Sequence, residues 1–334
     1  MHVKRYRDRI YTTHRHRQQD ESPNMDIGFF TNAGTETAWS LDECGAWAAA
    51  NDFDCVRLAD TGAADTHRIL DQGPDELRDG LAKHGIYLAC LTAHCNLLDD
   101  DEARRQSEQE RLIRAIDAAA LLECPVVLTG SGAPVRNGTF YGMYSSTPGN
   151  PTDRCDELVV RYRNMFAPVA AHAANKGIRI ALDVAVRMGN IGCNPEMWDK
   201  LLDAVPDESI GLSCDPSHWV WMGIMPAEDV IREYTGRWYF ADLKDCEVSP
   251  RMRYRQGVIG NWWWQYRVCG RGELNWATVI HALSESGYNY VLDVENEDRG
   301  MPGLAGFAYG GRHLRQLLPD AGQFQPAEDT WRIR

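Results

Sequence analysis

The 334-residue chain is predicted to fold as an α/β protein of the (β/α)8 TIM barrel class. Short apolar runs alternate with segments of helical length along most of the chain, which is typical of a parallel sheet with crossover helices. Four of these runs stop abruptly on a carboxylate, as buried strands do when they deliver side chains to a barrel rim. The nearest glycine pattern, Gly130-Ser-Gly132, lacks a third glycine and precedes a loop, which argues against dinucleotide binding.

The expected strands are short and largely apolar, as buried barrel strands are. Along the chain they cover residues 26–30, 53–58, 86–91, 125–129, 178–183, 210–215, 238–242 and 291–295. Because the carboxyl ends of barrel strands meet at one face, we expect the active site at the residues that follow them.

The expected helices lie between these strands. Ser40 and Glu43 have the spacing of a capping box, which predicts that a helix starts there. Further helical segments are expected at residues 75–84, 101–122, 153–176 and 308–318, the last of which would close the barrel.

Two segments interrupt this alternation. A long loop rich in Gly and Ser covers residues 130–152, and loops of this length after a barrel strand are usually functional or mobile. An aromatic-rich insertion between strands 7 and 8, at about residues 246–270, contains Trp262-Trp-Trp264. These tryptophans form either the core of a folded lid or an aromatic wall for a substrate.

The composition is that of a soluble globular protein with a large core, with 44% hydrophobic and 25% charged residues. No run approaches the roughly 18 apolar residues of a membrane helix. The net charge of −13 argues against a nucleic-acid surface, which needs a basic face. Ten scattered cysteines without a CxxC pair are expected to be reduced core residues, which indicates a cytoplasmic protein.

The chain divides into an N-terminal extension (1–25), one barrel domain (26–322) and a C-terminal tail (323–334). The extension is basic, and it is either a disordered or partner-docking arm, or a targeting or nucleic-acid arm. The sequence leaves open a homo-oligomer or a small partner subunit.

The four runs that end on a carboxylate predict a metal site. Their acidic residues are Asp183, Asp215, Asp242 and Glu295, hereafter the four strand-end carboxylates. Each one alone has an ordinary explanation as a helix cap or a solvated strand end. Together they would repel one another unless a cation neutralised them, and carboxylate oxygens suit a hard divalent ion.

Several polar and aromatic residues near these strand ends are candidates for substrate binding. His218 follows Asp215 by three residues, beyond a Pro turn, and is expected to face the substrate and assist catalysis. Lys244 and Arg271 either balance the acidic cluster or hold substrate oxygens. The remaining candidates are His94, Glu297 and Trp264.

The last 160 or so residues resemble the xylose-isomerase-like barrels often labelled sugar phosphate isomerase/epimerase. The similarity lies in Ile180-Ala-Leu-Asp183, Asp215-Pro-Ser-His218, Asp242-Leu-Lys-Asp245, Tyr266-Arg-Val-Cys-Gly-Arg-Gly-Glu-Leu-Asn-Trp276 and Val294-Glu-Asn-Glu-Asp298. The insertion that carries the tryptophans is also similar to that of the α-subunits of C-glycoside deglycosidases, which eliminate an aglycone from a 3-keto sugar.

This resemblance implies a divalent metal held by a Glu, an Asp, a His and a Glu, two of which also move protons next to a sugar carbonyl. The four strand-end carboxylates take these positions, with Asp183 in place of the first Glu and Asp242 in place of the His. The resulting all-oxygen site favours Mn or Mg over Co or Zn. Asp183 is also one methylene shorter than Glu, which reduces its reach.

The predicted function is a metal-dependent sugar isomerase or epimerase that transfers a proton next to the carbonyl of a keto-sugar or sugar conjugate. Asp183 and Glu295 are the expected acid and base, with His218 assisting. One alternative is a lyase that eliminates an aglycone or water from a 3-keto-glycoside or an inosose, since both reactions begin with the same enolate. The other alternative is a non-catalytic sugar-binding module.

Overall fold

The computed structural model describes residues 25–31, 39–134, 155–184, 190–258, 260 and 262–318. The predicted C-terminal tail, most of the predicted N-terminal extension and most of the 130–152 loop lie outside these residues.

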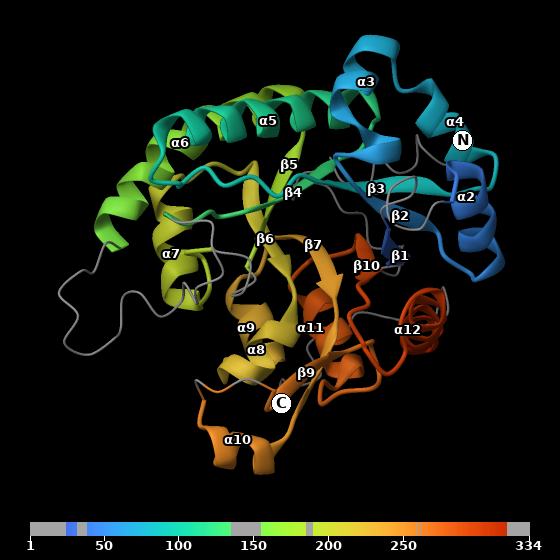
Figure 1. The fold of residues 1–334 in the computed structure, drawn as a ribbon, viewed down its shortest axis with the longest axis vertical. Coiled ribbons are helices and arrows are strands. Elements are labelled where there is room, and N and C mark those ends of the chain that lie inside the picture. Colours follow the sequence, from blue (N-terminus) through green and yellow to red (C-terminus); the bar gives the residue numbers. More distant parts are fainter. Residues whose placement is uncertain are drawn as a thin grey trace, which may run out of the picture.

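Eight parallel strands of the described chain form a closed barrel in the order β1-β10-β7-β6-β5-β4-β3-β2 (Figure 1). They are β1 (Asp26–Thr31), β2 (Cys55–Ala59), β3 (Tyr87–Thr92), β4 (Val126–Gly130), β5 (Arg179–Asp183), β6 (Ile210–Cys214), β7 (Trp238–Leu243) and β10 (Val291–Val294). Their apolar side chains are almost completely buried, as the near-continuous hydrophobic runs predict. The predicted TIM barrel and its eight strands are confirmed.

Helices surround the barrel and cover its apolar outer surface (Figure 1). They are α2 (Leu41–Ala50), α3 (Thr66–Gln72), α4 (Asp75–Ala82), α5 (Glu102–Leu121), α6 (Cys155–Lys176), α7 (Pro195–Ala204), α8 (Pro216–Met222), α9 (Ala227–Glu233), α11 (Trp276–Glu285) and α12 (Leu304–Leu317), with a short 3-10 turn, η1 (Gly62–Ala64). Ser40 and Glu43 form the predicted capping box at the start of α2.

The insertion between the last two barrel strands folds as an antiparallel hairpin. It consists of β8 (Asp245–Val248), α10 (Pro250–Gln256) and β9 (Trp264–Arg267), and is called the aromatic hairpin below. Trp264 is buried and stacks on Trp221 of α8 at 4.6 Å between ring centroids, and Trp263 is buried beside it. Trp262 is 61% exposed. Two of the three tryptophans therefore form the core of the hairpin, and the action of this hairpin as a lid stays a prediction.

Asp245 attaches the aromatic hairpin to the barrel. Its side chain is fully buried and accepts hydrogen bonds from the backbone N–H groups of Cys246, Gly270 and Leu274. It also accepts one from the indole N–H of Trp276, the first residue of α11. One carboxylate thus joins the end of β7, both ends of the insertion and the next helix.

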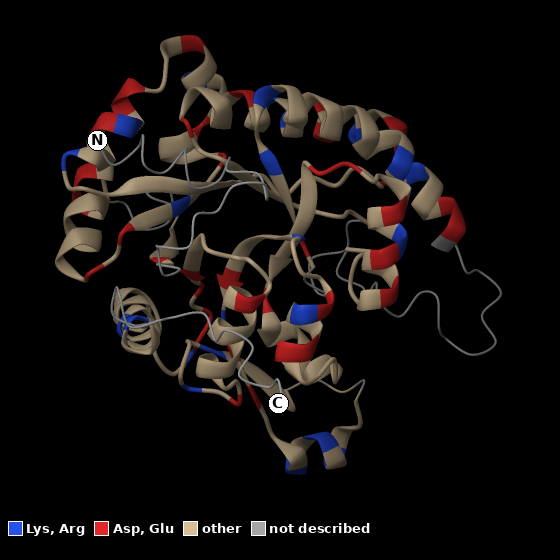
Figure 2. Cartoon of the chain, turned by 180° about the vertical axis from the view of Figure 1, so that it is seen from behind, with Lys and Arg blue, Asp and Glu red and all other residues tan. Residues whose placement is uncertain are grey.

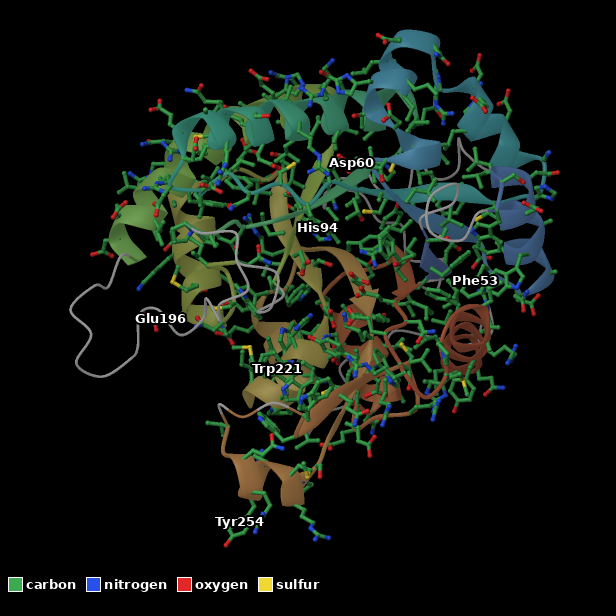
Figure 3. The ribbon with its side chains drawn as sticks, in the orientation of Figure 1. Phe53, Asp60, His94, Glu196, Trp221 and Tyr254 are labelled. Atoms are coloured by element: carbon green, nitrogen blue, oxygen red, sulfur yellow. The ribbon has the colours of Figure 1, made fainter. Side chains whose placement is uncertain are left out.

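The outer surface is charged and uneven. Figure 2 shows acidic residues spread over the outer helices, whereas α10 at the tip of the aromatic hairpin carries basic ones. Tyr254 projects from this tip and is 88% exposed (Figure 3). No helix among the described residues is both long and apolar enough to cross a bilayer. All nine cysteines whose side chains are described are buried and free, as predicted.

We expect Asp245→Ala to destabilise the protein by roughly 3 kcal/mol or more, because four donors lose their buried acceptor and each costs about 1 kcal/mol or more. Urea denaturation followed by tryptophan fluorescence measures this loss. Asp245→Asn, which keeps one acceptor oxygen, should fall between the wild type and the alanine variant. A loss below about 1 kcal/mol for Asp245→Ala would show that the hairpin is held by its apolar contacts instead.

Candidate active site

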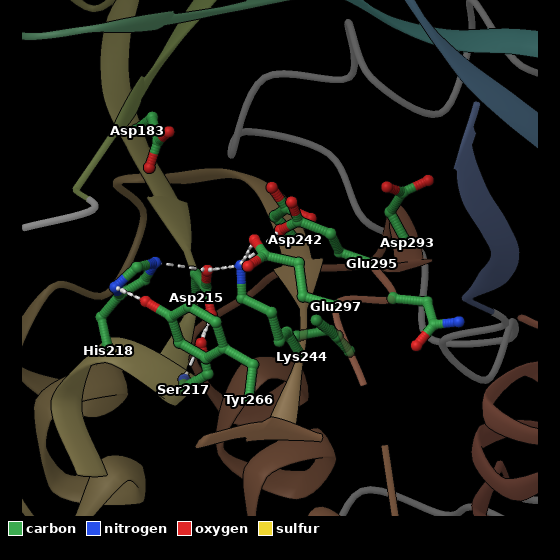
Figure 4. A network of polar contacts seen from close by, with 12 residues as sticks. Asp183, Asp215, Ser217, His218, Asp242, Lys244, Tyr266, Asp293, Glu295 and Glu297 are labelled. Atoms are coloured by element: carbon green, nitrogen blue, oxygen red, sulfur yellow. Dashed lines mark hydrogen bonds and ion pairs between the residues drawn. The ribbon is translucent and has the colours of Figure 1, made fainter. Parts of the chain in front are cut away.

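The four strand-end carboxylates lie at the carboxyl ends of β5, β6, β7 and β10, which are neighbours in the barrel. Asp183 is the last residue of β5, and Asp242 lies near the end of β7. Asp215 directly follows β6, and Glu295 directly follows β10. We call this end of the barrel the mouth. Figure 4 shows Asp215, Asp242 and Glu295 close together and Asp183 apart from them.

Lys244 lies at the centre of the mouth. Its Nζ atom is 2.9 Å from Oε2 of Glu295, 3.0 Å from Oε1 of Glu297 and 3.5 Å from Oδ2 of Asp215 (Figure 4). The residue is 2% exposed, and the ring of Tyr266 covers its Nζ atom at 4.3 Å. Burial alone would lower the pKa of Lys244, but the surrounding carboxylates raise it well above its usual value, so the side chain is an ammonium ion.

Asp215 connects the mouth to the aromatic hairpin through a chain of hydrogen bonds. Asp215 caps the N-terminus of α8, because its Oδ1 atom accepts from the backbone N–H and the hydroxyl of Ser217. Its Oδ2 atom is 3.1 Å from Nε2 of His218, whose Nδ1 atom is 2.8 Å from the hydroxyl of Tyr266. Burial raises the pKa of Asp215, but Lys244 and His218 outweigh burial and hold it below its usual value.

This chain of contacts also assigns a role to His218. A neutral ring that donates from Nε2 to Asp215 accepts from the Tyr266 hydroxyl at Nδ1. His218 is almost completely buried and both of its ring nitrogens are engaged by the protein. The structure places it between Asp215 and Tyr266, where it positions both, and its expected role at the substrate stays a prediction.

A buried arginine holds the floor of the mouth. Arg57 of β2 reaches across the barrel interior, with Nη2 2.7 Å from Oδ1 of Asp242 and Nε 2.8 Å from Oδ2 of Asp293. Its guanidinium lies over the ring of Phe30 at 4.1 Å. We call Arg57, Asp242 and Asp293 the Arg57 triad. Sequence reasoning missed Arg57 and Asp293, although each is a charged residue inside an otherwise apolar strand.

Among the described residues, the mouth holds more carboxylates than its two buried cations, Arg57 and Lys244, neutralise. Burial raises the pKa of Asp293 to about 7, against the opposing effect of Arg57, and nearby Glu295 adds to the increase. Asp242 is affected in the same way, and its pKa lies well above the usual value. Glu295 differs, because Lys244 and Arg57 overcome burial and lower its pKa, so it is ionised at neutral pH.

The remaining predicted site residues are His94, Arg271 and Trp264. His94 lies toward the centre of the barrel (Figure 3), with its Nδ1 atom 3.9 Å from Oδ2 of Asp183. Arg271 pairs with Asp298 at 3.2 Å instead of with a strand-end carboxylate. Trp264 is buried against Trp221 and contacts Tyr266 edge-on, so it supports the ring that covers Lys244.

The donor types at the mouth suit a divalent cation, but their arrangement does not. Asp215 and Glu295 are arranged around the Lys244 ammonium, and Asp242 is bound by Arg57. Among the described residues, no group of three or more His, Cys, Asp or Glu side chains is placed to hold a metal ion. Binding of Mn or Mg therefore stays a prediction from the sequence.

A family model described as "Xylose isomerase-like TIM barrel" matches residues 46–317, which is most of the chain. The chain belongs to this family. The family resemblance predicted from the sequence is confirmed, and the matched span includes the four strand-end carboxylates. The narrower resemblance to C-glycoside deglycosidase α-subunits stays a prediction.

Individual proteins support the same fold. An uncharacterized protein of Bacillus subtilis, YfiH, is 25% identical over 261 residues, which cover 73% of this chain and 82% of that protein. A xylose isomerase domain protein from Planctomyces limnophilus superposes with a TM-score of 0.63 and 18% identity, covering 89% of this chain and 97% of that one. The 3-keto-D-glucoside 4-epimerase YcjR from E. coli superposes with a TM-score of 0.64 and 13% identity, covering 88% of this chain and 100% of that one.

Asp293→Asn tests the raised pKa of Asp293, whose main cause is burial. The folded state holds the Asp293 proton up to a pH of about 7, whereas the unfolded chain releases it near the usual pKa of 3.8. The wild type should therefore lose stability relative to the variant as the pH rises between these values, by up to about 1.4 kcal/mol per pH unit.

Urea denaturation of both proteins between pH 5 and 8 measures this difference. Asp229→Asn, at an exposed position on α9, is the control and should track the wild type at every pH. A difference between Asp293→Asn and the wild type that does not change with pH would mean that Asp293 is ionised throughout.

Proposed function

We propose that the protein is a sugar isomerase or epimerase that moves a proton at the carbon next to a carbonyl group. Family membership supports a sugar substrate, since the similar structures include a D-psicose 3-epimerase and a 3-keto-D-glucoside 4-epimerase. Chemistry of this kind needs a base that is ionised at neutral pH and a fixed positive charge for the enolate oxygen.

The observation that carries this proposal is the contact between Glu295 and Lys244. The carboxylate and the ammonium lie 2.9 Å apart at the mouth, where barrel enzymes bind their substrates. Lys244 keeps Glu295 in the anionic form that a base requires. A base and a positive charge held this close can act on one carbon and its neighbouring carbonyl oxygen.

A second carboxylate, Asp183, lies at the mouth apart from Lys244 (Figure 4). Its Oδ2 atom is 3.9 Å from Nδ1 of His94. Two bases on opposite sides of a planar enolate allow a proton to leave one face and return on the other, which inverts the carbon. We assign Glu295 as the base that takes the proton and Asp183, when it carries a proton, as the acid that delivers one to the opposite face; exchange with solvent then restores both groups.

The charge of the mouth favours an uncharged sugar over a sugar phosphate. Arg57 and Lys244, the two buried cations described at the mouth, are already paired with carboxylates. A phosphate group placed here would meet uncompensated negative charge. We therefore propose an unphosphorylated keto-sugar or a glycoside as the substrate class.

We expect Glu295→Gln to reduce the exchange of substrate C–H protons with deuterated water by about 10²–10⁴-fold, because the amide cannot accept the proton. NMR of the wild type and variant with a panel of keto-sugars and 3-keto-glycosides measures the exchange. Release of an aglycone by the wild type would select the lyase alternative, since elimination follows the same enolate.

Glu285→Gln is the control, because Glu285 is exposed on α11 and pairs with Arg232. It should leave the exchange rate unchanged. Near-normal exchange in Glu295→Gln would remove Glu295 from the mechanism, and the absence of exchange in the wild type with every sugar would favour a binding module.

A further inference from the structure

Lys244 occupies the space between residues that the family resemblance assigns to a metal ion. Two of the four strand-end carboxylates, Asp215 and Glu295, direct an oxygen at its Nζ atom, at 3.5 and 2.9 Å. Asp242 is also engaged, because its Oδ1 atom pairs with Arg57 at 2.7 Å. Each of these three predicted ligands is thus paired with a Lys or Arg side chain, instead of converging with the others on a position for a metal ion.

We propose that Lys244 takes the place of the divalent ion in this protein, so that its ammonium group stabilises the enolate oxygen and no divalent metal is required. This inference rests on the proposed sugar isomerase or epimerase activity.

The surroundings of Lys244 hold its charge in one position. The side chain is buried, the Tyr266 ring covers it, and the Tyr266 hydroxyl is fixed by His218. A divalent ion bound by the same carboxylates would lie within a few ångströms of this ammonium and would be repelled by it. Displacing the ammonium would leave a buried positive charge without its partners.

The Asp at position 242 also supports the replacement of the metal ion by protein cations. The family resemblance implies a His here, and a neutral imidazole would not pair with a guanidinium as a carboxylate does. Asp242 and Arg57 form a close, buried ion pair at 2.7 Å. Position 242, which the resemblance assigns to a metal ligand, is thus half of an internal salt bridge.

The reaction balances without any further reagent. Glu295 takes the proton from the carbon next to the carbonyl, the electron pair of that C–H bond moves to form the enolate, and the carbonyl oxygen becomes negative. Lys244 donates a hydrogen bond to this oxygen and keeps its own proton. The oxygen would replace Glu297, the most exposed of the three carboxylates around Nζ. Carbon then takes a proton from Asp183 on the opposite face, as in the proposed epimerisation, or back from Glu295.

Metal content tests the proposal directly in the purified full-length protein. We expect less than one tenth of an equivalent of Mn, Mg, Co or Zn per chain by mass spectrometry. Neither Mn²⁺ nor EDTA should change the melting temperature or the rate of deuterium exchange. One bound equivalent of metal, or a melting temperature that falls with EDTA, would overturn the proposal.

Variants of Lys244 test whether it holds the place of the ion. In Lys244→Met the carboxylates lose their cation, so Mn²⁺ should raise the melting temperature by several degrees while leaving that of Lys244→Arg unchanged. Deuterium exchange should fall at least 100-fold in Lys244→Met and less in Lys244→Arg. Indifference of a folded Lys244→Met to Mn²⁺ would overturn the assigned place of the ammonium.

The two proposals fail in different ways. If Lys244→Met does not fold, the metal measurements on the wild type still decide the question. If the wild type exchanges no protons with any sugar, the proposed activity fails and the enolate role of Lys244 fails with it. Exchange that requires added Mn²⁺ would support the activity and overturn the replacement of the metal.

Discussion

The Arg57 triad supports the acidic mouth of the barrel. A charge buried inside a barrel is tolerated only when it is paired, because removing one partner leaves the other without water or counter-charge. Arg57 supplies that partner to two carboxylates from neighbouring strands, at 2.7 and 2.8 Å. Asp242 of β7 and Asp293 of β10 can therefore both be buried inside the barrel, because they share one cation.

Geometry explains why so much negative charge collects at one place. Parallel strands in a closed barrel all end at the same rim, so carboxylates that are far apart in sequence become neighbours. Two basic side chains at different depths oppose this repulsion: Arg57 lies within the barrel and Lys244 at its mouth. Burial, with a smaller contribution from neighbouring carboxylates, raises the pKa of Asp242 and Asp293.

The fold was predictable because its signals are local. Strand length, apolar composition and the abrupt carboxylate ends identified all eight strands, and the rim placement of the four strand-end carboxylates follows from them. The partners of those carboxylates were not predictable. Arg57 is 185 residues from Asp242, and only closure of the barrel brings the two together. Likewise, nothing in the Asp215-Pro-Ser-His218 motif reveals that Tyr266 of the insertion binds the other side of the imidazole.

The aromatic hairpin has two parts, a base that is bonded to the barrel and an exposed tip. Asp245 fixes its base through hydrogen bonds to residues 246, 270, 274 and 276, and the paired strands hold Tyr266 opposite Cys246. The segment containing α10 makes none of these bonds and has an exposed tip. Its length and sequence are therefore free to diverge between related proteins, because insertions and deletions at such a tip leave the cover over Lys244 in place.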